Sequence, residues 1–276
     1  MIDGFDLGAF VAATLAEDMG TGGDRTSAAV IPADAVLTAV MDSRDAVTVA
    51  GLPIAAAFFR ALDGDCAIET LVDEGARVAA GTDLMRITGN ARALLTAERS
   101  ALNTVQHLTG IATLTRAYVD AIVGTGAILL DTRKTLPGLR VLEKYATRMG
   151  GATNHRMRLD DGVMIKDNHI AVAGGVDAAV RAAKAAGLTG VVVEVDTLDQ
   201  IVPALAAGAD RLLLDNMVPE TLRQAVSLIA GRVPTEASGG VNLLTIRAIA
   251  ETGVNYISVG RITQSAPAAD IGLDFG

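Results

Sequence analysis

The second half of this chain alternates short apolar runs with alanine-rich amphipathic stretches, at a spacing of roughly 20 to 30 residues. The apolar runs cover residues 127–130, 163–165, 191–195, 211–214, 233–235 and 256–259. The amphipathic stretches cover residues 139–148, 176–187, 198–208, 219–230 and 243–253. Such alternation predicts parallel strands covered by helices, arranged either as an open doubly wound sheet or as a (β/α) barrel.

Polar residues or glycine directly follow nearly every apolar run. They are Asp131-Thr132-Arg133-Lys134, Lys166-Asp167-Asn168-His169, Glu194, Asp215-Asn216, Glu236-Ala237-Ser238-Gly239-Gly240 and Gly260. A barrel enzyme builds its site from the carboxyl ends of many strands, whereas a doubly wound sheet concentrates its ligand at one switch point. The number of contributing strand ends therefore favours a barrel.

The first 110 residues follow a different pattern. Residues 36–49, 75–81 and 84–87 indicate strands joined by glycine turns, residues 52–62 indicate a helix, and a second helix is expected over 90–108 with Asn90 as its N-cap. We predict a smaller α+β sandwich domain over residues 1–110. A TIM-like (β/α) barrel of about six or seven parallel strands is expected over residues 111–276.

Composition narrows the classes of function. A net charge of −9 and an aromatic content of 3% argue against a nucleic-acid partner. The single cysteine, Cys66, cannot form an internal disulfide or a cysteine-based zinc site, and we expect it to fill the core. Apolar runs fall far short of the ~18 residues of a membrane span, and the opening Met1-Ile2-Asp3-Gly4 lacks the pattern of a signal peptide. We therefore expect a cytoplasmic protein without a membrane partner.

Positive charge gathers in one stretch of this acidic chain. Residues 131–167 carry eight of the 23 lysines and arginines. If the barrel is correct, one pocket contains Arg133, Lys134, His155, Arg156 and Lys166. Arginine grips carboxylates with two parallel hydrogen bonds and lysine acts as a point charge, so the pocket suits a substrate with two or three negative charges. For residues 131–140 taken alone, the alternative interpretation is a charged loop that is exposed to solvent.

Two of these residues allow more than one role. A lone histidine is more often structural than catalytic, and beside Arg156 the favoured role of His155 is that of a neutral donor to a carboxylate. Lys166 could form a Schiff base if its neighbours depressed its pKa, although the adjoining Asp167 weakens that interpretation.

Acidic and glycine-rich strand ends complement the cationic ones. Glu194 and Asp215 end successive strands, and nothing in the sequence neutralises them. One interpretation is that they interact with the positive N-terminal ends of helices. The other is that they are oxygen ligands for Mg²⁺ or hydrogen-bond acceptors for sugar hydroxyls. Ser238-Gly239-Gly240 and Gly260 predict backbone amides that hold a phosphate, although glycine pairs are more often simple turns.

Several longer motifs occur together and in order. They are Glu17-Asp18-Met19-Gly20, Gly23-Asp24-Arg25-Thr26-Ser27, Ala97-Glu98-Arg99-Ser100-Ala101-Leu102-Asn103, Thr109-Gly110-Ile111-Ala112-Thr113, the segment 131–140, Asn154-His155-Arg156, Ile165-Lys166-Asp167-Asn168-His169, Leu214-Asp215-Asn216 and Glu236-Ala237-Ser238-Gly239-Gly240. With this combination the chain resembles the quinolinate phosphoribosyltransferase family from about Leu15 to Leu273.

The resemblance implies the reaction of quinolinate with phosphoribosyl pyrophosphate (PRPP) and Mg²⁺ to give nicotinate mononucleotide, pyrophosphate and CO₂, in de novo NAD biosynthesis. It implies quinolinate binding by Thr132, Arg133, His155, Arg156, Lys166 and, from the partner subunit of a homodimer or higher oligomer, Arg99. It implies catalytic roles for Lys134 at the pyrophosphate and for Glu194 and Asp215 at the ribose and metal. The PRPP phosphate would contact Ser238, Gly239, Gly240, Val259, Gly260 and Arg261.

Three positions depart from the family pattern. Thr263-Gln264-Ser265 replaces the usual Thr-His-Ser, Arg158 stands where glycine is common, and Arg261 stands where a small residue is usual. Other functions stay open on the residues alone. They are a related phosphoribosyltransferase of the molybdenum-operon type, a catalytically silent phosphate-ligand binding protein, and a Schiff-base lyase.

Overall fold

The computed structural model describes residues 4–275, so Met1, Ile2 and Asp3 of the opening segment lie outside the described residues. Contacts divide the chain into two compact units. The first contains residues up to 116, residues 141–151 and residues from 266 onward, and the second contains residues 117–140 and 152–265. The predicted division into 1–110 and 111–276 treats each domain as one continuous stretch, whereas these units interleave along the chain.

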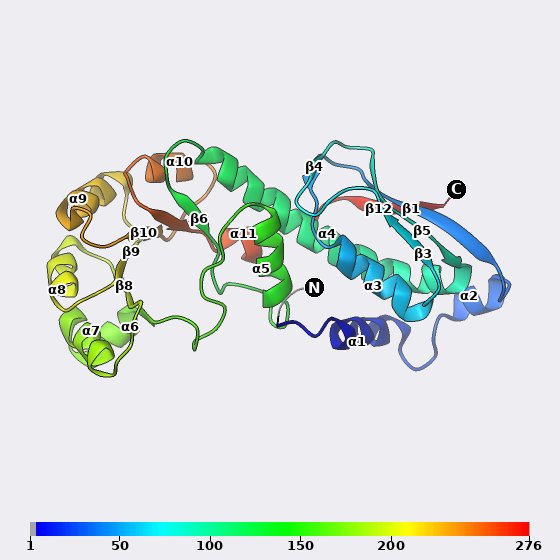
Figure 1. The fold of residues 1–276 in the computed structure, drawn as a ribbon, viewed down its shortest axis with the longest axis horizontal. Helices are drawn as coiled ribbons and strands as arrows, with labels where there is room; N and C mark the ends of the chain where they lie inside the picture. The colour runs from blue at the N-terminus through cyan, green and yellow to red at the C-terminus, as the bar shows by residue number, and fades with distance from the viewer. Residues whose placement is uncertain (1–3, 276) are drawn as a thin grey trace. The chain divides into compact units, whose positions relative to one another are not determined.

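The first unit is built on a four-stranded antiparallel sheet with the order β12-β1-β5-β3. Its strands are β1 (Val36–Ser43), β3 (Ala67–Thr70), β5 (Thr82–Asn90) and β12 (Ile271–Phe275). The short strands β2 (Val47–Thr48) and β4 (Arg77–Val78) pair separately. Helices α3 (Leu52–Leu62) and α4 (Ala91–Ala121) lie along one face of the sheet (Figure 1). The other helices here are α1 (Leu7–Met19), α2 (Arg25–Val30) and most of α5 (Arg140–Met149).

Side-chain caps start several of these helices. Asp6 accepts from the amide of Ala9 at 2.9 Å, which satisfies one free N–H in the first turn of α1. Asn90 accepts from Ala93 N at 3.2 Å, so the cap predicted from the sequence is confirmed.

The helix that follows Asn90 does not stop at residue 108 but continues to Ala121. Gly110 lies inside it, and a Cβ built there would come within 2.0 Å of the carbonyl oxygen of Pro267. This glycine therefore allows the returning C-terminal segment to cross the helix closely. Beyond the crossing, Ile271–Phe275 pairs with β1 as strand β12, which the sequence reasoning did not predict.

The second unit contains a six-stranded parallel sheet with the order β6-β11-β10-β9-β8-β7. The strands are β6 (Ile128–Leu130), β7 (Met164–Ile165), β8 (Val192–Val195), β9 (Arg211–Asp215), β10 (Thr235–Ser238) and β11 (Tyr256–Ser258). Thr153 adds a parallel bridge to Leu130 beside β6. Starting from Thr153, the neighbours are β6, β11, β10, β9, β8 and β7 in turn. Apart from β6 and β11, neighbouring strands are consecutive in the chain, as in a barrel. The predicted α/β architecture with a barrel-like domain is confirmed.

Helices alternate with these strands. They are α6 (Asp167–Ala173), α7 (Val176–Ala185), the 3₁₀ turn η1 (Leu198–Gln200), α8 (Ile201–Ala206), α9 (Pro219–Ile229), α10 (Ile246–Ala250) and α11 (Arg261–Gln264). Helices α7, α8 and α9 lie outside β8, β9 and β10 (Figure 1). No helix among residues 4–275 is both long and apolar enough to cross a membrane.

One strand begins later than the sequence suggested. Strand β10 covers Thr235–Ser238 rather than residues 233–235, since Pro234 has no N–H to donate to a neighbouring strand. Glu236 was predicted to follow the strand but lies inside it, and its side chain is fully buried. This shift places a carboxylate inside the barrel.

Candidate functional site

A cavity of about 760 Å³ lies among the carboxyl ends of the parallel strands in the second unit. Fourteen of the fifteen residues that the sequence proposed for the site line it: Thr132, Arg133, Lys134, His155, Arg156, Lys166, Glu194, Asp215, Ser238, Gly239, Gly240, Val259, Gly260 and Arg261. The exception, Arg99, is exposed on helix α4 in the first unit. The positions of the fourteen agree with a site built from many strand ends.

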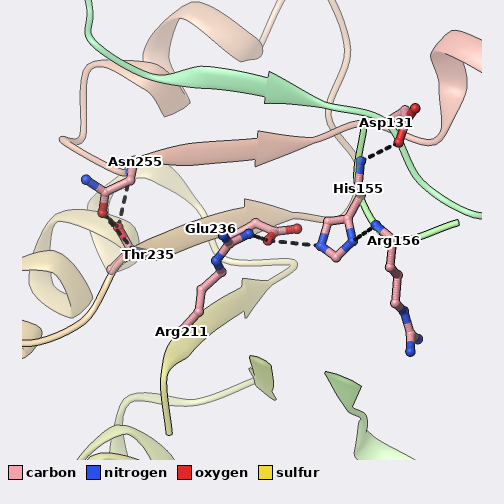
Figure 2. Close-up of polar contacts among 7 residues, drawn as sticks. All are labelled: Asp131, His155, Arg156, Arg211, Thr235, Glu236 and Asn255. Atoms are coloured by element: carbon pink, nitrogen blue, oxygen red, sulfur yellow. Dashed lines mark hydrogen bonds and ion pairs between the residues drawn. The ribbon is translucent and has the colours of Figure 1, made fainter. Parts of the chain in front are cut away.

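Asp131 fastens the cationic side of this cavity. It is buried at the end of β6, where Oδ1 accepts from the amide of His155 at 2.7 Å and Oδ2 accepts from Nδ2 of Asn154 at 2.6 Å. Figure 2 shows the contact with His155. The sequence singled out Asp131 only as the start of a cationic segment, so its role as an acceptor was missed. It holds the loop that carries His155 against β6.

Arg133 and Arg156 are the two arginines of the cationic wall. Nε of Arg133 is buried and has no hydrogen-bond partner among residues 4–275. Nη1 of Arg156 donates to the carbonyl of Gly162 at 3.0 Å. Burial lowers the pKa of Arg156, and the neighbouring charge of Arg133 lowers it further. An anionic ligand with two carboxylates would relieve this repulsion.

Arg158, whose direction the sequence left open, does not line the cavity. Its Nε donates to Asp160 at 2.8 Å, and its side chain is 68% exposed. This departure from the family pattern therefore adds no cation to the cavity wall.

Lys166 corrects the expectation that nothing neutralises Glu194. Its Nζ donates to Oε2 of Glu194 at 2.8 Å, so the cationic and acidic walls of the cavity meet at this pair. The nitrogen that would have to attack a carbonyl is thus held by a carboxylate. A Schiff-base role for Lys166 is therefore disfavoured. His169 completes the turn, since its Nδ1 accepts from the amide of Lys166 at 2.9 Å where α6 begins.

Glu194 and Asp215 form the acidic wall of the cavity, and the exposed carboxylate of Asp196 lies beside them. Ligand oxygens of Glu194, Asp196 and Asp215 all lie within 4.8 Å of one another. Burial raises the pKa of Asp215, and the charges of Glu194 and Asp196 raise it further. Carboxylate oxygens are the ligands that Mg²⁺ prefers, so this donor set fits that ion.

Sequence reasoning missed Asp196 because it lies just past the end of β8. Its spacing could have revealed it. Side chains two residues apart on a strand point the same way, which places Asp196 on the side of Glu194.

The glycine-rich end of the cavity depends on one tight contact. Gly239 has φ +88°, and a Cβ built there would come within 2.1 Å of Oδ1 and 2.8 Å of the amide nitrogen of Asn216. That amide donates to the carbonyl of Ser238 at 2.9 Å. Both the positive φ and the lack of room for a Cβ therefore require glycine at position 239. Gln264, the residue that replaces the family's histidine, also lines the cavity.

His155 finds its carboxylate partner inside the protein. Its Nδ1 accepts from the amide of Arg156 at 2.7 Å, and its Nε2 lies 3.4 Å from Oε2 of Glu236 (Figure 2). Arg211 places Nη1 3.3 Å from the same oxygen. Burial raises the pKa of Glu236, but hydrogen bonds from His155 and Ser258 and the charge of Arg211 outweigh burial and leave this pKa lowered.

Comparison with known proteins gives consistent matches over most of the chain. The family models for the N-terminal and C-terminal domains of quinolinate phosphoribosyl transferase match residues 24–109 and 111–274. The chain is 45% identical to the nicotinate-nucleotide pyrophosphorylase [carboxylating] of Mycobacterium leprae, covering 94% of each protein. It is 42% identical to the probable enzyme of that name from Bacillus subtilis, covering 94% of this chain and 89% of the other.

A solved structure extends the similarity to the fold. The nicotinate-nucleotide pyrophosphorylase from Francisella tularensis superposes with a TM-score of 0.93 at 41% identity. The match covers 98% of this chain and 96% of that one.

Proposed function

The chain belongs to the quinolinate phosphoribosyltransferase family, and we propose that its cavity transfers the phosphoribosyl group of PRPP to the ring nitrogen of quinolinate. The products are nicotinate mononucleotide, pyrophosphate and CO₂, which makes the chain an enzyme of NAD biosynthesis. The observation that carries this proposal is one cavity that joins two arginines, the carboxylates of Glu194 and Asp215, and a glycine-rich strand end.

The cationic wall suits the two carboxylates of quinolinate. Arg133 and Arg156 would hold these carboxylates by paired hydrogen bonds, and Lys166 would add charge where the two walls meet. Firm binding at this end directs the ring nitrogen toward the ribose. Positioning alone contributes much of the rate, because two bound reactants need no further collision.

The acidic wall and the glycine-rich end suit PRPP. Glu194 and Asp215 would accept hydrogen bonds from the ribose hydroxyls, and amides near Gly239 would bind the 5′-phosphate. As the ribose bond to pyrophosphate breaks, the ribose gains oxocarbenium character and negative charge leaves with pyrophosphate. Lys134 would stabilise that departing charge. No nucleophilic side chain is needed.

Decarboxylation follows from the product of the first step. The glycosylated ring nitrogen is positively charged, so it stabilises the ylide that remains when the adjacent carboxylate leaves as CO₂. The protein must therefore hold the substrate without surrounding the departing carboxylate with further cations.

We further propose that Mg²⁺ binds at Glu194, Asp196 and Asp215. When bound, the ion would neutralise phosphate charge on PRPP and its leaving group.

We also propose a cytoplasmic homodimer in which Arg99, absent from the cavity lining of its own chain, completes the partner's site.

The decisive assay offers quinolinate and nicotinate separately with PRPP and Mg²⁺ and follows CO₂ and nicotinate mononucleotide. We expect both products from quinolinate, in equal amounts, and no product from nicotinate. Turnover of nicotinate, or no turnover of quinolinate, would contradict the proposal.

Omitting Mg²⁺ in the presence of a chelator should abolish turnover, and full activity without the ion would contradict the metal site.

A further inference from the structure

A chain of polar contacts runs through the barrel of the second unit, with the fully buried Glu236 at its centre. The guanidinium of Arg211 lies 4.2 Å above the ring of Tyr256 and reaches Glu236, whose carboxylate faces His155. His155 in turn contacts the backbone of Arg156, at the cavity (Figure 2). The carboxylate of Glu236 is fully buried, so its charge requires these partners.

The contacts of His155 determine where its proton lies. The amide of Arg156 is a donor, so the Nδ1 that accepts from it at 2.7 Å carries no proton. In the neutral imidazole the proton is then on Nε2, which lies 3.4 Å from Oε2 of Glu236. The N–H of the ring is therefore directed into the barrel wall rather than toward a substrate carboxylate.

We propose that Glu236, held by Arg211, is a positioning residue that fixes the ring of His155 and, through it, the backbone of Arg156 at the quinolinate end of the cavity. The proposal rests on the function proposed above and changes the role of His155. The imidazole does not bind a quinolinate carboxylate but supports the arginine that does. Asp131 reinforces this arrangement, because its Oδ1 accepts from the amide of His155 at 2.7 Å.

The tautomer of His155 tests the proposal without any assay of activity. The chain has three histidines, so ¹⁵N-labelled imidazole signals can be assigned by comparison with a His155→Gln variant. We expect His155 to be the Nε2–H tautomer in the wild-type protein, and Glu236→Gln to weaken that preference. A wild-type His155 with its proton on Nδ1 would overturn the proposal, whatever the enzyme turns over.

Kinetics of Glu236→Gln separate positioning from general damage. We expect the KM for quinolinate to rise about 10-fold, the low end of the loss seen when a carboxylate that orients a metal-bound histidine is removed, and the KM for PRPP to change less than about 2-fold. Glu236 is two residues from Ser238, so damage transmitted along β10 would weaken PRPP binding as well. Equal losses for both substrates would therefore overturn the proposal.

Two further variants sharpen this test. If Glu236 acts through His155, the double variant Glu236→Gln, His155→Ala should bind quinolinate no more weakly than His155→Ala alone. Fully additive losses would contradict that route.

The matched control is Glu143→Gln. Glu143 is equally buried and lies 2.9 Å from Nε2 of His107, but neither residue lines the cavity. This variant should leave both KM values unchanged, and a comparable rise for quinolinate would show that the loss is not specific to Glu236.

Discussion

At the scale of single residues, the cationic wall depends on the shape of its side chains as well as on their charge. Arg133→Lys keeps the charge but removes the planar pair of donors that matches a carboxylate. Loss of a charge-assisted hydrogen bond costs about 1.5–3 kcal/mol, so the KM for quinolinate should rise between about 10-fold and 150-fold. Initial rates at varied quinolinate measure it. Arg158→Lys is the control, because Arg158 is exposed and outside the cavity, and an unchanged KM for Arg133→Lys would contradict its assigned role.

Gly239 and Gly240 provide a matched pair of substitutions at the opposite end. Both have positive φ, but a Cβ at Gly239 would collide with Asn216 whereas one at Gly240 meets nothing within 4 Å. Gly240→Ala should therefore lower the unfolding free energy by only about 1–2 kcal/mol and weaken PRPP binding less than Gly239→Ala does. Gly239→Ala should lose more than this and bind PRPP much more weakly. Urea unfolding and PRPP titration would check both, and identical behaviour would contradict the steric argument.

The sequence predicted which residues gather around the cavity better than it predicted their contacts. Strand-end polarity placed Arg133, Glu194 and Ser238 correctly around one cavity because parallel strands end at one edge. It did not reveal the pairing of Lys166 with Glu194, which are 28 positions apart. Nor did it reveal Glu236 as an interior residue, since that depends on where β10 begins.

At the scale of secondary-structure elements, local pattern predicted helices well and helix ends less well. The helix at Leu52–Leu62 was predicted with its observed bounds, because proline in its first turn and a strongly apolar face mark it clearly. The end of α4 was predicted at residue 108 instead of Ala121. Glycine commonly ends a helix, and Gly110 lies just beyond the predicted end. Here this glycine serves a tertiary crossing by Pro267, which no local pattern contains.

Helix α3 begins at a cap supplied from a distant part of the chain. The carboxylate of Glu74 accepts from the amides of Gly51 at 2.7 Å and Leu52 at 2.8 Å, and also from the hydroxyl of Tyr145 on α5. Gly51, at the N-cap position, has no side chain with which to cap the helix itself. Burial raises the pKa of Tyr145, and the hydrogen bond to Glu74 raises it further.

This raised pKa predicts a loss of stability in alkaline solution. Below about pH 10 the phenol of Tyr145 is protonated in both the folded and the unfolded chain. Above that pH the unfolded chain releases the proton and the folded chain retains it, so the unfolding free energy falls by at most about 1.4 kcal/mol per pH unit from this group. Urea unfolding between pH 9 and 11 should show a steeper decline for the wild type than for Tyr145→Phe. Parallel declines would contradict the assignment.

At the scale of the whole molecule, the cavity residues and Arg99 belong to different units of the chain. The fourteen that line the cavity all come from the second unit, whereas Arg99 is an exposed residue of the first. A two-fold homodimer would let each chain supply Arg99 to the other chain's cavity, and it would make each site dependent on two chains. Mixtures of inactive variants can test that dependence.

Arg99→Ala and Lys134→Ala should each be inactive alone but should recover activity when their subunits are mixed by refolding together. A hybrid dimer then contains one cavity with Lys134 from one chain and Arg99 from the other, while its second cavity lacks both. Random pairing makes half of the dimers hybrids, so about a quarter of wild-type activity should return. Arg133→Ala mixed with Lys134→Ala is the control, because both residues line the same cavity of a single chain and no hybrid has an intact site. Failure of the first mixture would contradict an Arg99 that acts across a subunit interface, and recovery in the second would contradict a site that takes Arg133 and Lys134 from a single chain.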